Sequence, residues 1–143
     1  MRILAVDPGE KFLGLAISDP TGTIAGPLTV LRHRARQADA EAIARLAAQH
    51  GAARIVVGQA TDAQGQPTTL QARRAANLAQ ALRQVSGLPV VLWDETGSTR
   101  KALEAWRQMG TARRRQRRAD AVAATVILQS YLDAGAPLPQ EVE

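Results

Sequence analysis

The stretch that decides the fold is Met1–Asp19, MRILAVDPGEKFLGLAISD. Two short apolar runs, Ile3–Val6 and Leu13–Ile17, are rich in Val, Ile and Leu and end at charged or turn-forming residues. This pattern is typical of buried strands. The first run leads directly into Asp7, and a carboxylate buried without a partner is costly. The partner of Asp7 is either the backbone of its own Asp-Pro-Gly turn or a group supplied by another part of the chain or its surroundings.

Further strands and helices follow along the chain. Short apolar runs predict strands at 55–57 and 90–93 and a weaker one at 28–31. Helical spacing of apolar residues predicts helices over 39–49, 69–85, 98–109 and 119–133. Asp39 suits the N-cap of the first helix, and Gly87–Pro89 ends the second.

The order of these elements predicts a mixed α/β layer fold. Strands 55–57 and 90–93 each follow a helix, so we expect both to run parallel to the first strand through right-handed crossovers. The first two or three strands are joined by short links, which favours a hairpin meander. We expect one domain over residues 1–134 and a frayed C-terminal tail over 135–143.

Composition excludes several functional classes. The chain has 143 residues, of which 45% are hydrophobic and 22% charged, an ordinary globular balance. It has no cysteine, which excludes disulfides, thiolate zinc sites and cysteine nucleophiles. Charged residues interrupt the N-terminal apolar run early, unlike a signal peptide, and no apolar stretch approaches the roughly 20 residues of a membrane helix. We therefore expect a soluble cytoplasmic protein.

Arginine dominates the positive charge. The net charge is +5, and 16 of the 18 basic residues are arginine. This favours a polyanionic partner, although the codon usage of a GC-rich genome would give a similar composition. Five arginines fall within 113–118, directly before Asp120, and Glu104 is the only acid in 100–118. We predict that this basic loop holds the substrate backbone and that shape gives specificity. The alternative is a basic loop without function.

The few aromatic and histidine residues give no sign of base recognition. Trp93 and Tyr131 fall at core-like positions, so no aromatic platform for stacking bases is evident. This favours recognition of folded or duplex nucleic acid. His33 and His50 lie in or beside predicted loops, and we assign neither a role.

Acidic residues gather where the predicted parallel strands end. Asp7 follows the first strand, Asp94-Glu95 follow the strand at 90–93, and Asp120 begins the helix predicted at 119–133. Ligands of open α/β sheets lie beyond the carboxyl ends of the strands. Clustered carboxylates coexist most easily around a shared divalent cation, and oxygen ligands favour Mg²⁺ or Mn²⁺. Asp120 in a first helical turn could instead complement the helix dipole, and Glu95 could be a solvated loop acid.

Three segments resemble signatures of the YqgF/RuvX family, relatives of the RuvC resolvase in the RNase H-like superfamily. They are ILAVDPGEKFLGLAISD, DETGST and ADAVAATVILQSYLD, and they occur in the family's order. The resemblance implies an RNase H-like fold with a central five-stranded mixed sheet flanked by helices. It also implies a Mg²⁺- or Mn²⁺-dependent nuclease whose catalytic and metal-binding acids are Asp7, Glu95 and Asp120.

The middle segment departs from the family's pattern. Thr96 follows Asp94-Glu95 where the family usually has arginine, Phe12 replaces another arginine, and Gly58-Gln59-Ala60 stand where Gly-Leu-Pro is usual. The three acids are retained. The basic residues expected to bind nucleic acid are Lys11, Arg100, Lys101, Arg113, Arg114, Arg115, Arg117 and Arg118.

Several functions are compatible with this site. The resemblance favours a nuclease that processes the 5′ end of pre-16S rRNA. A Holliday junction resolvase would use the same acids on four-way DNA and would be a symmetric dimer. The sequence is compatible with either a monomer or a homodimer. A catalytically weak nucleic-acid-binding protein is the third possibility. Half of an actin- or sugar-kinase-like ATPase also has Asp-x-Gly after its first strand, but two such domains do not fit in this chain.

Overall fold

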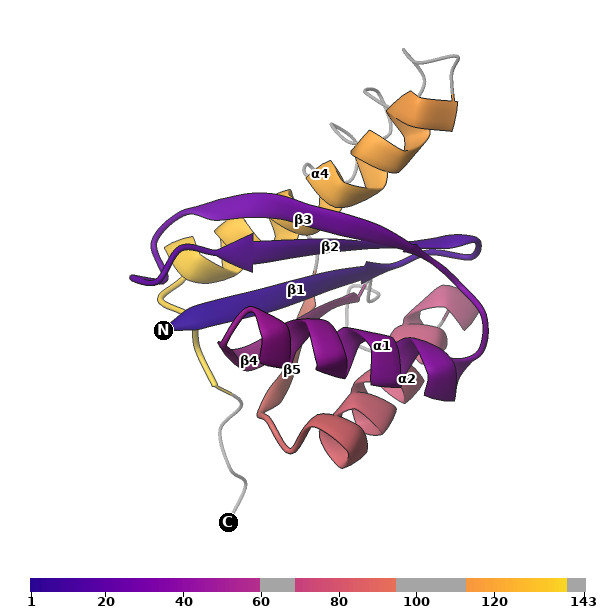
Figure 1. Ribbon diagram of the computed structural model, residues 1–143, viewed down its shortest axis with the longest axis horizontal. Coiled ribbons are helices and arrows are strands. Elements are labelled where there is room, and N and C mark those ends of the chain that lie inside the picture. The colour runs from indigo at the N-terminus through magenta and orange to yellow at the C-terminus, as the bar shows by residue number, and fades with distance from the viewer. Residues whose placement is uncertain (60–68, 95–112, 139–143) are drawn as a thin grey trace.

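The computed structural model describes residues 1–59, 69–94 and 113–138, without the side chains of 113–119. Five strands form one sheet in the order β3-β2-β1-β4-β5 (Figure 1). The strands are β1 (Arg2–Pro8), β2 (Phe12–Ser18), β3 (Ala25–Arg32), β4 (Ala52–Gln59) and β5 (Val90–Asp94). All five predicted strands are therefore confirmed. Each contains its apolar run and extends it by one to three residues at one or both ends.

Strand directions agree with the prediction from connection lengths. β1 pairs antiparallel with β2, and β2 antiparallel with β3, which gives the expected meander. β4 runs parallel to β1, and β5 runs parallel to β4. The carboxyl ends of β1, β4 and β5 consequently share one edge of the sheet. The mixed sheet predicted by the resemblance is thus confirmed.

Helices cover both faces of the sheet. The described helices are α1 (Arg36–Gln49), α2 (Leu70–Ser86) and α4 (Arg113–Asp133). Helices α1 and α2 pack together on one face, and α4 crosses the other, mainly over β2, β3 and β1 (Figure 1). No helix in the described ranges combines the length and hydropathy needed to cross a membrane.

Strand alternation builds a separate core on each side of the sheet. Leu4, Val6, Leu13 and Leu15 face α1 and α2, where they pack with residues such as Leu82. Ile3, Ala5 and Ala16 face α4, where they pack with Ala124, Ile127, Leu128 and Tyr131. The Trp93 ring meets the fully buried Tyr131 ring edge to face, with centroids 5.3 Å apart. The prediction that both aromatics belong to the core is confirmed.

The first two helices start and stop for different reasons. α1 begins at Arg36, after Ala35, so the predicted N-cap role of Asp39 is wrong. Asp39 lies in the first turn and is buried. In α2, Thr69 is the N-cap and its hydroxyl accepts the Ala72 N–H. Gly87 ends α2 in the left-handed conformation (φ 66°), as predicted from the Gly87–Pro89 segment.

The last helix starts six residues earlier than predicted. The run Arg113–Arg118 forms the first turns of α4 and is not the loop we expected. Its sequence has no apolar periodicity, and apolar spacing was the signal used to find helices. The helix predicted at 98–109 lies outside the described residues. The tail begins less frayed than expected, since the Ala136 and Pro137 carbonyls accept hydrogen bonds from Arg54 and Tyr131.

Candidate active site

Asp7 lies at the carboxyl end of β1, at the sheet edge where we predicted ligands to bind. Ile3 and Ala5 of β1 pack in the core beneath α4. Side chains alternate along a strand, so Asp7 shares their face. It is partly exposed, unlike the apolar residues that precede it. Asp7 therefore terminates the buried strand on the α4 side of the sheet.

Gly14 brings α4 close to Asp7. It pairs with Asp7 across the β1–β2 ladder. A Cβ atom added to Gly14 would lie 1.9 Å from the Asp120 carbonyl oxygen and 2.4 Å from the carbonyl carbon. No real Cβ atom approaches backbone so closely, so only glycine allows α4 to cross here. The Asp120 backbone consequently rests on the residue that pairs with Asp7.

Asp120 lies in the middle of α4 rather than in its first turn. The helix begins at Arg113, so the alternative reading of Asp120 as a first-turn dipole partner is wrong. Asp120 is one turn before the fully buried Ala124, on the same stripe as Ile127 and Tyr131. The sequence predicts that this helix faces the sheet with Val122, Ala123, Val126, Ile127 and Ser130. That prediction is only partly correct, because Ala123 and Ile127 are buried whereas Val122, Val126 and Ser130 are partly exposed. The stripe is rotated, which turns Asp120 toward the sheet.

The third predicted acid, Glu95, lies outside the described residues. Strand β5 ends at the exposed Asp94, which pairs with Gln59 at the end of β4. Val91 and Trp93 of β5 pack in the core beneath α4. In the described part of the chain, no three His, Asp or Glu side chains are grouped to hold a metal. Of the three predicted acids, the structure places the backbone of Asp120 against Gly14, the residue that pairs with Asp7.

The basic residues predicted to bind nucleic acid are only partly described. Lys11 is exposed in the β1–β2 turn. Arg100 and Lys101 lie outside the described residues. The backbone of the remaining five arginines forms the beginning of α4, which extends from the sheet on the N-terminal side of Asp120 (Figure 1). These arginines precede Asp120 by at most seven residues, or about 10 Å of helix.

Two features were missed in the sequence. Gly14 interrupts an apolar strand, and a glycine inside a strand is a recognised sign of close backbone approach. His33 was assigned no role, but its Nδ1 lies 2.5 Å from Asp39 Oδ2. Asp39 Oδ1 also accepts the Arg34 N–H, at 3.1 Å. No spacing rule would have paired His33 with Asp39, since the chain turns from β3 into α1 between them.

Comparison with protein families gives a match over almost the whole chain. The model described as "RuvX: Holliday junction resolvase" matches residues 1–134. A protein of Symbiobacterium thermophilum is 39% identical over 142 residues, which cover 99% of this chain and 98% of its own. A protein of Anaeromyxobacter sp. is 40% identical over 134 residues, covering 93% and 97%. Both relatives are named "Putative pre-16S rRNA nuclease".

Solved structures of resolvases share the fold. Thermus thermophilus RuvC in complex with Holliday junction substrate matches with a TM-score of 0.58 and 16% identity, over 98% of this chain and 100% of the other. The Fowlpox virus resolvase, solved with Holliday junction DNA, matches with a TM-score of 0.59 and 14% identity, over 96% and 100%. At this identity the likeness establishes the RuvC-like, RNase H-like fold alone.

Proposed function

The chain belongs to the RuvX family, and we propose that it is a divalent-metal-dependent nuclease that processes the 5′ end of pre-16S rRNA. The observation that supports this most strongly is the approach of two carboxylates from distant parts of the chain. Asp7 ends β1, and the Asp120 backbone rests on Gly14, the residue paired with Asp7. Residues 1–134 would act as one nuclease domain, in the cytoplasm where such RNA is found.

The donor set suits a hard cation. Asp7 and Asp120 offer oxygen ligands, are both partly exposed, and lie in a chain without cysteine. Oxygen ligands with open coordination positions fit Mg²⁺ or Mn²⁺. We propose Glu95 as the third ligand, because in the sequence it directly follows β5, whose carboxyl end lies at the same edge of the sheet as that of β1. When bound, the cation supplies an activated water and stabilises charge on the phosphodiester.

The chain's own residues would hold the substrate and the ion. The carboxylates of Asp7, Glu95 and Asp120 would fix the ion against the scissile phosphate. The first two turns of α4 carry five arginines, and arginine binds phosphate oxygens in two-point fashion. We propose that these turns, with Lys11, Arg100 and Lys101, contact the backbone of the nucleic acid. Such contacts are independent of sequence and sensitive to salt.

Cleavage of a four-way DNA junction is the second candidate. It is favoured by the family's description and by the likeness in fold to solved junction resolvases. The acids do not discriminate between the two substrates, since both present phosphodiesters. The names of the curated relatives favour the rRNA substrate.

The decisive experiment compares two substrates and three variants. A 16S rRNA fragment with a 5′ extension and a four-way DNA junction are each incubated with Mn²⁺, Mg²⁺ or EDTA. We expect Mn²⁺- or Mg²⁺-dependent cleavage of the RNA, faster than of the junction. Asp7→Asn and Asp120→Asn should each lower the rate at least 100-fold, because each removes a charged ligand, while RNA binding stays equal or becomes tighter.

Asp133→Asn is the matched control. Asp133 is an exposed acid at the far end of the same helix, where it accepts a hydrogen bond from Gln129. Its replacement should leave the cleavage rate within about twofold of the parent. Wild-type rates in Asp7→Asn would show that the active site is elsewhere. Binding without cleavage under all metal conditions would identify a nucleic-acid-binding protein instead.

A further inference from the structure

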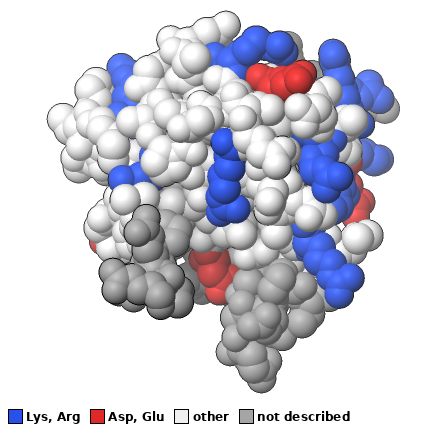
Figure 2. Space-filling view, turned by 90° about the horizontal axis from the view of Figure 1, so that it is seen from below, with Lys and Arg blue, Asp and Glu red and all other residues white. Residues whose placement is uncertain are grey.

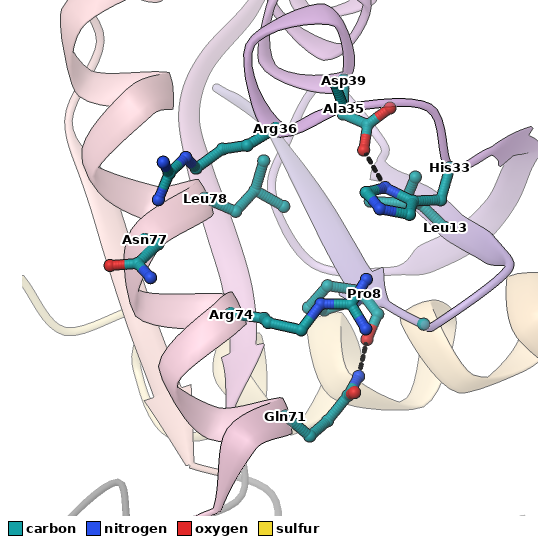
Figure 3. A pocket seen from close by; sticks show the side chains of 11 residues that line it. Pro8, Leu13, His33, Ala35, Arg36, Asp39, Gln71, Arg74, Asn77 and Leu78 are labelled. Atoms are coloured by element: carbon teal, nitrogen blue, oxygen red, sulfur yellow. Dashed lines mark hydrogen bonds and ion pairs between the residues drawn. The ribbon is translucent and has the colours of Figure 1, made fainter.

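A cavity lies on the side of the sheet opposite α4. Its volume is about 270 Å³, and it lies between the N-terminal turns of α1, the first half of α2 and the β1–β2 turn. Pro8, Leu13 and Leu78 give it an apolar floor, and Arg36, Arg74 and Asn77 stand at its rim (Figure 3). The Gln71 side chain donates to the Pro8 carbonyl, which fixes α2 against the turn. The cavity is therefore part of the folded structure and needs no rearrangement to exist.

The two arginines at the rim have no partner among the described residues. No hydrogen bond or ion pair within the described part of the chain engages the guanidinium of Arg36 or Arg74 or the amide of Asn77. Arg36 extends from α1 toward Asn77, and Arg74 extends from α2 toward Pro8, with Leu78 between them (Figure 3). The cavity thus has a donor-rich group at each end and an apolar surface in the middle.

The acid in the wall of the cavity is engaged by its neighbours. Asp39 is buried, and its two oxygens contact His33 Nδ1 at 2.5 Å and the Arg34 N–H at 3.1 Å. Helix α2 contains three arginines and no acid. Figure 2 shows the surface of α1 and α2, where Lys and Arg outnumber Asp and Glu among the described residues. The surroundings of the cavity therefore favour an anion.

We propose that this cavity binds one unpaired nucleotide. The base would lie on the floor formed by Pro8, Leu13 and Leu78, where it loses contact with water. Phosphates on its two sides would bind Arg36 and Arg74, each through the guanidinium fork. Asn77 would offer its amide to a base edge. A volume of 270 Å³ is just below the usual range for ligand cavities, which suits one nucleotide better than a larger cofactor.

Phosphate charge and base are both needed for this fit. A simple anion would use the arginines but leave the middle of the cavity unfilled, and a neutral nucleoside would leave both guanidinium groups without a counter-charge. The cavity is on the opposite side of the sheet from Asp120, next to Pro8, which directly follows Asp7. Binding here goes beyond the proposed function because it requires no cleavage.

The test is a titration of the ¹⁵N-labelled protein followed by NMR, in EDTA so that cleavage plays no part. The probes are 5′-AMP, adenosine, inorganic phosphate, a single-stranded tetraribonucleotide and an RNA duplex. We expect 5′-AMP to shift the amides of Gly9, Asn77 and Leu78 and to bind at least fivefold more tightly than adenosine or phosphate. The single strand should bind at least as tightly as 5′-AMP if the nucleotide belongs to an RNA chain. If only 5′-AMP binds, the ligand is a free nucleotide.

Arg74→Gln and Arg36→Gln should each weaken binding of the tetraribonucleotide at least fivefold, and one of the two should weaken binding of 5′-AMP, which has a single phosphate, by the same factor. Arg73→Gln is the matched control, because Arg73 is the neighbouring exposed residue of α2 and does not line the cavity. It should change the affinity less than twofold. The proposal is overturned if Arg73→Gln weakens binding as much as Arg74→Gln, if the shifts lie outside the cavity, or if the duplex binds there more tightly than the single strand.

Discussion

The two faces of the sheet are packed in different ways. Beneath α1 and α2 the strands present large side chains such as Leu4, Leu13 and Ile55. Beneath α4 they present Ile3, Val56 and Val91 but also the small residues Ala5, Ala16 and Gly14, and α4 contributes Ala124. Large side chains hold helices away from a sheet, whereas small ones allow backbone to approach backbone. The face beneath α4 is the close face, and it brings the Asp120 backbone next to the Asp7–Gly14 pair. The candidate site therefore depends on small side chains at this contact, above all on the missing Cβ of Gly14.

The largest effect is expected from adding one methyl group to the close face. Gly14→Ala would place a Cβ 1.9 Å from the Asp120 carbonyl oxygen, so α4 must move or tilt. We expect loss of cleavage together with a loss of unfolding free energy of about 3 kcal/mol, the upper end for an overpacked core. Cleavage assays and urea denaturation measure the two effects.

Gly26→Ala provides the control for this substitution. A Cβ at Gly26, in strand β3, meets nothing within 4 Å. This variant should retain cleavage and change the unfolding free energy by less than about 1 kcal/mol. An active, stable Gly14→Ala variant would show that the close approach of α4 is not required.

A deletion on the other face should affect stability without affecting chemistry. Leu82 belongs to α2 and is fully buried against the sheet, so Leu82→Ala leaves a cavity and should lower the unfolding free energy by about 2–4 kcal/mol. Measured well below the melting temperature, the cleavage rate per folded molecule should stay within about twofold of the parent. A large drop in that rate would mean that packing on the α1 and α2 face affects the candidate active site on the α4 face.

Charge at the beginning of α4 should affect binding alone. Replacing Arg113, Arg114 and Arg115 by Ala removes three phosphate-binding groups, and each neutralised phosphate contributes close to one unit to the salt slope. We expect RNA affinity to fall at least tenfold at low salt and the plot of log affinity against log salt to flatten. Fluorescence anisotropy at several salt concentrations measures both. An unchanged slope would place the phosphate contacts elsewhere.

The smallest effect is expected at the far end of α4. The Gln129 side chain bonds Thr23 and Ala25 in and after the β2–β3 turn, and Asp19 holds that turn. Hydrogen bonds from the Ile24 N–H, the Thr21 hydroxyl and the Thr23 N–H hold the pKa of Asp19 well below its usual range. A lowered carboxyl pKa stabilises the fold above the unfolded pKa of about 3.9, and this contribution is lost as pH falls below it.

Asp19→Asn should therefore lower the melting temperature slightly near neutral pH. The difference from the parent should shrink as pH falls below about 4, because the unfolded parent then binds a proton at this carboxylate that the folded parent, with its lowered pKa, does not bind. Differential scanning calorimetry across this range measures the difference. A constant difference at every pH would show that the turn is held by geometry rather than by charge.

The contrast between the faces also explains which features could be predicted from the sequence. Strands, their directions and the place of Asp7 follow from apolar runs and from connection lengths, which are local properties. The start of α4 could not be predicted, because Arg113–Arg118 has no apolar spacing. The orientation of Asp120 depends on the rotation of α4, which is set by Ala124, Tyr131 and the glycine on the facing strand. The pairing of His33 with Asp39 likewise depends on how the chain turns from β3 into α1, not on spacing.

The way α4 is held has a mechanical consequence. Its C-terminal end is anchored by Arg54, whose guanidinium donates to the Tyr131 hydroxyl at 3.0 Å and to the Ala136 carbonyl at 2.8 Å. Its middle rests on Gly14, and its arginine-bearing turns extend beyond the sheet (Figure 1). Helix α4 is therefore held at its C-terminal end and at the backbone of Asp120, and its N-terminal turns project from the sheet. In the proposed binding mode, a polyanion on these turns would bind within about 10 Å of helix from a backbone contact that leaves α4 little room to shift, so Asp120 would keep its position while the substrate binds.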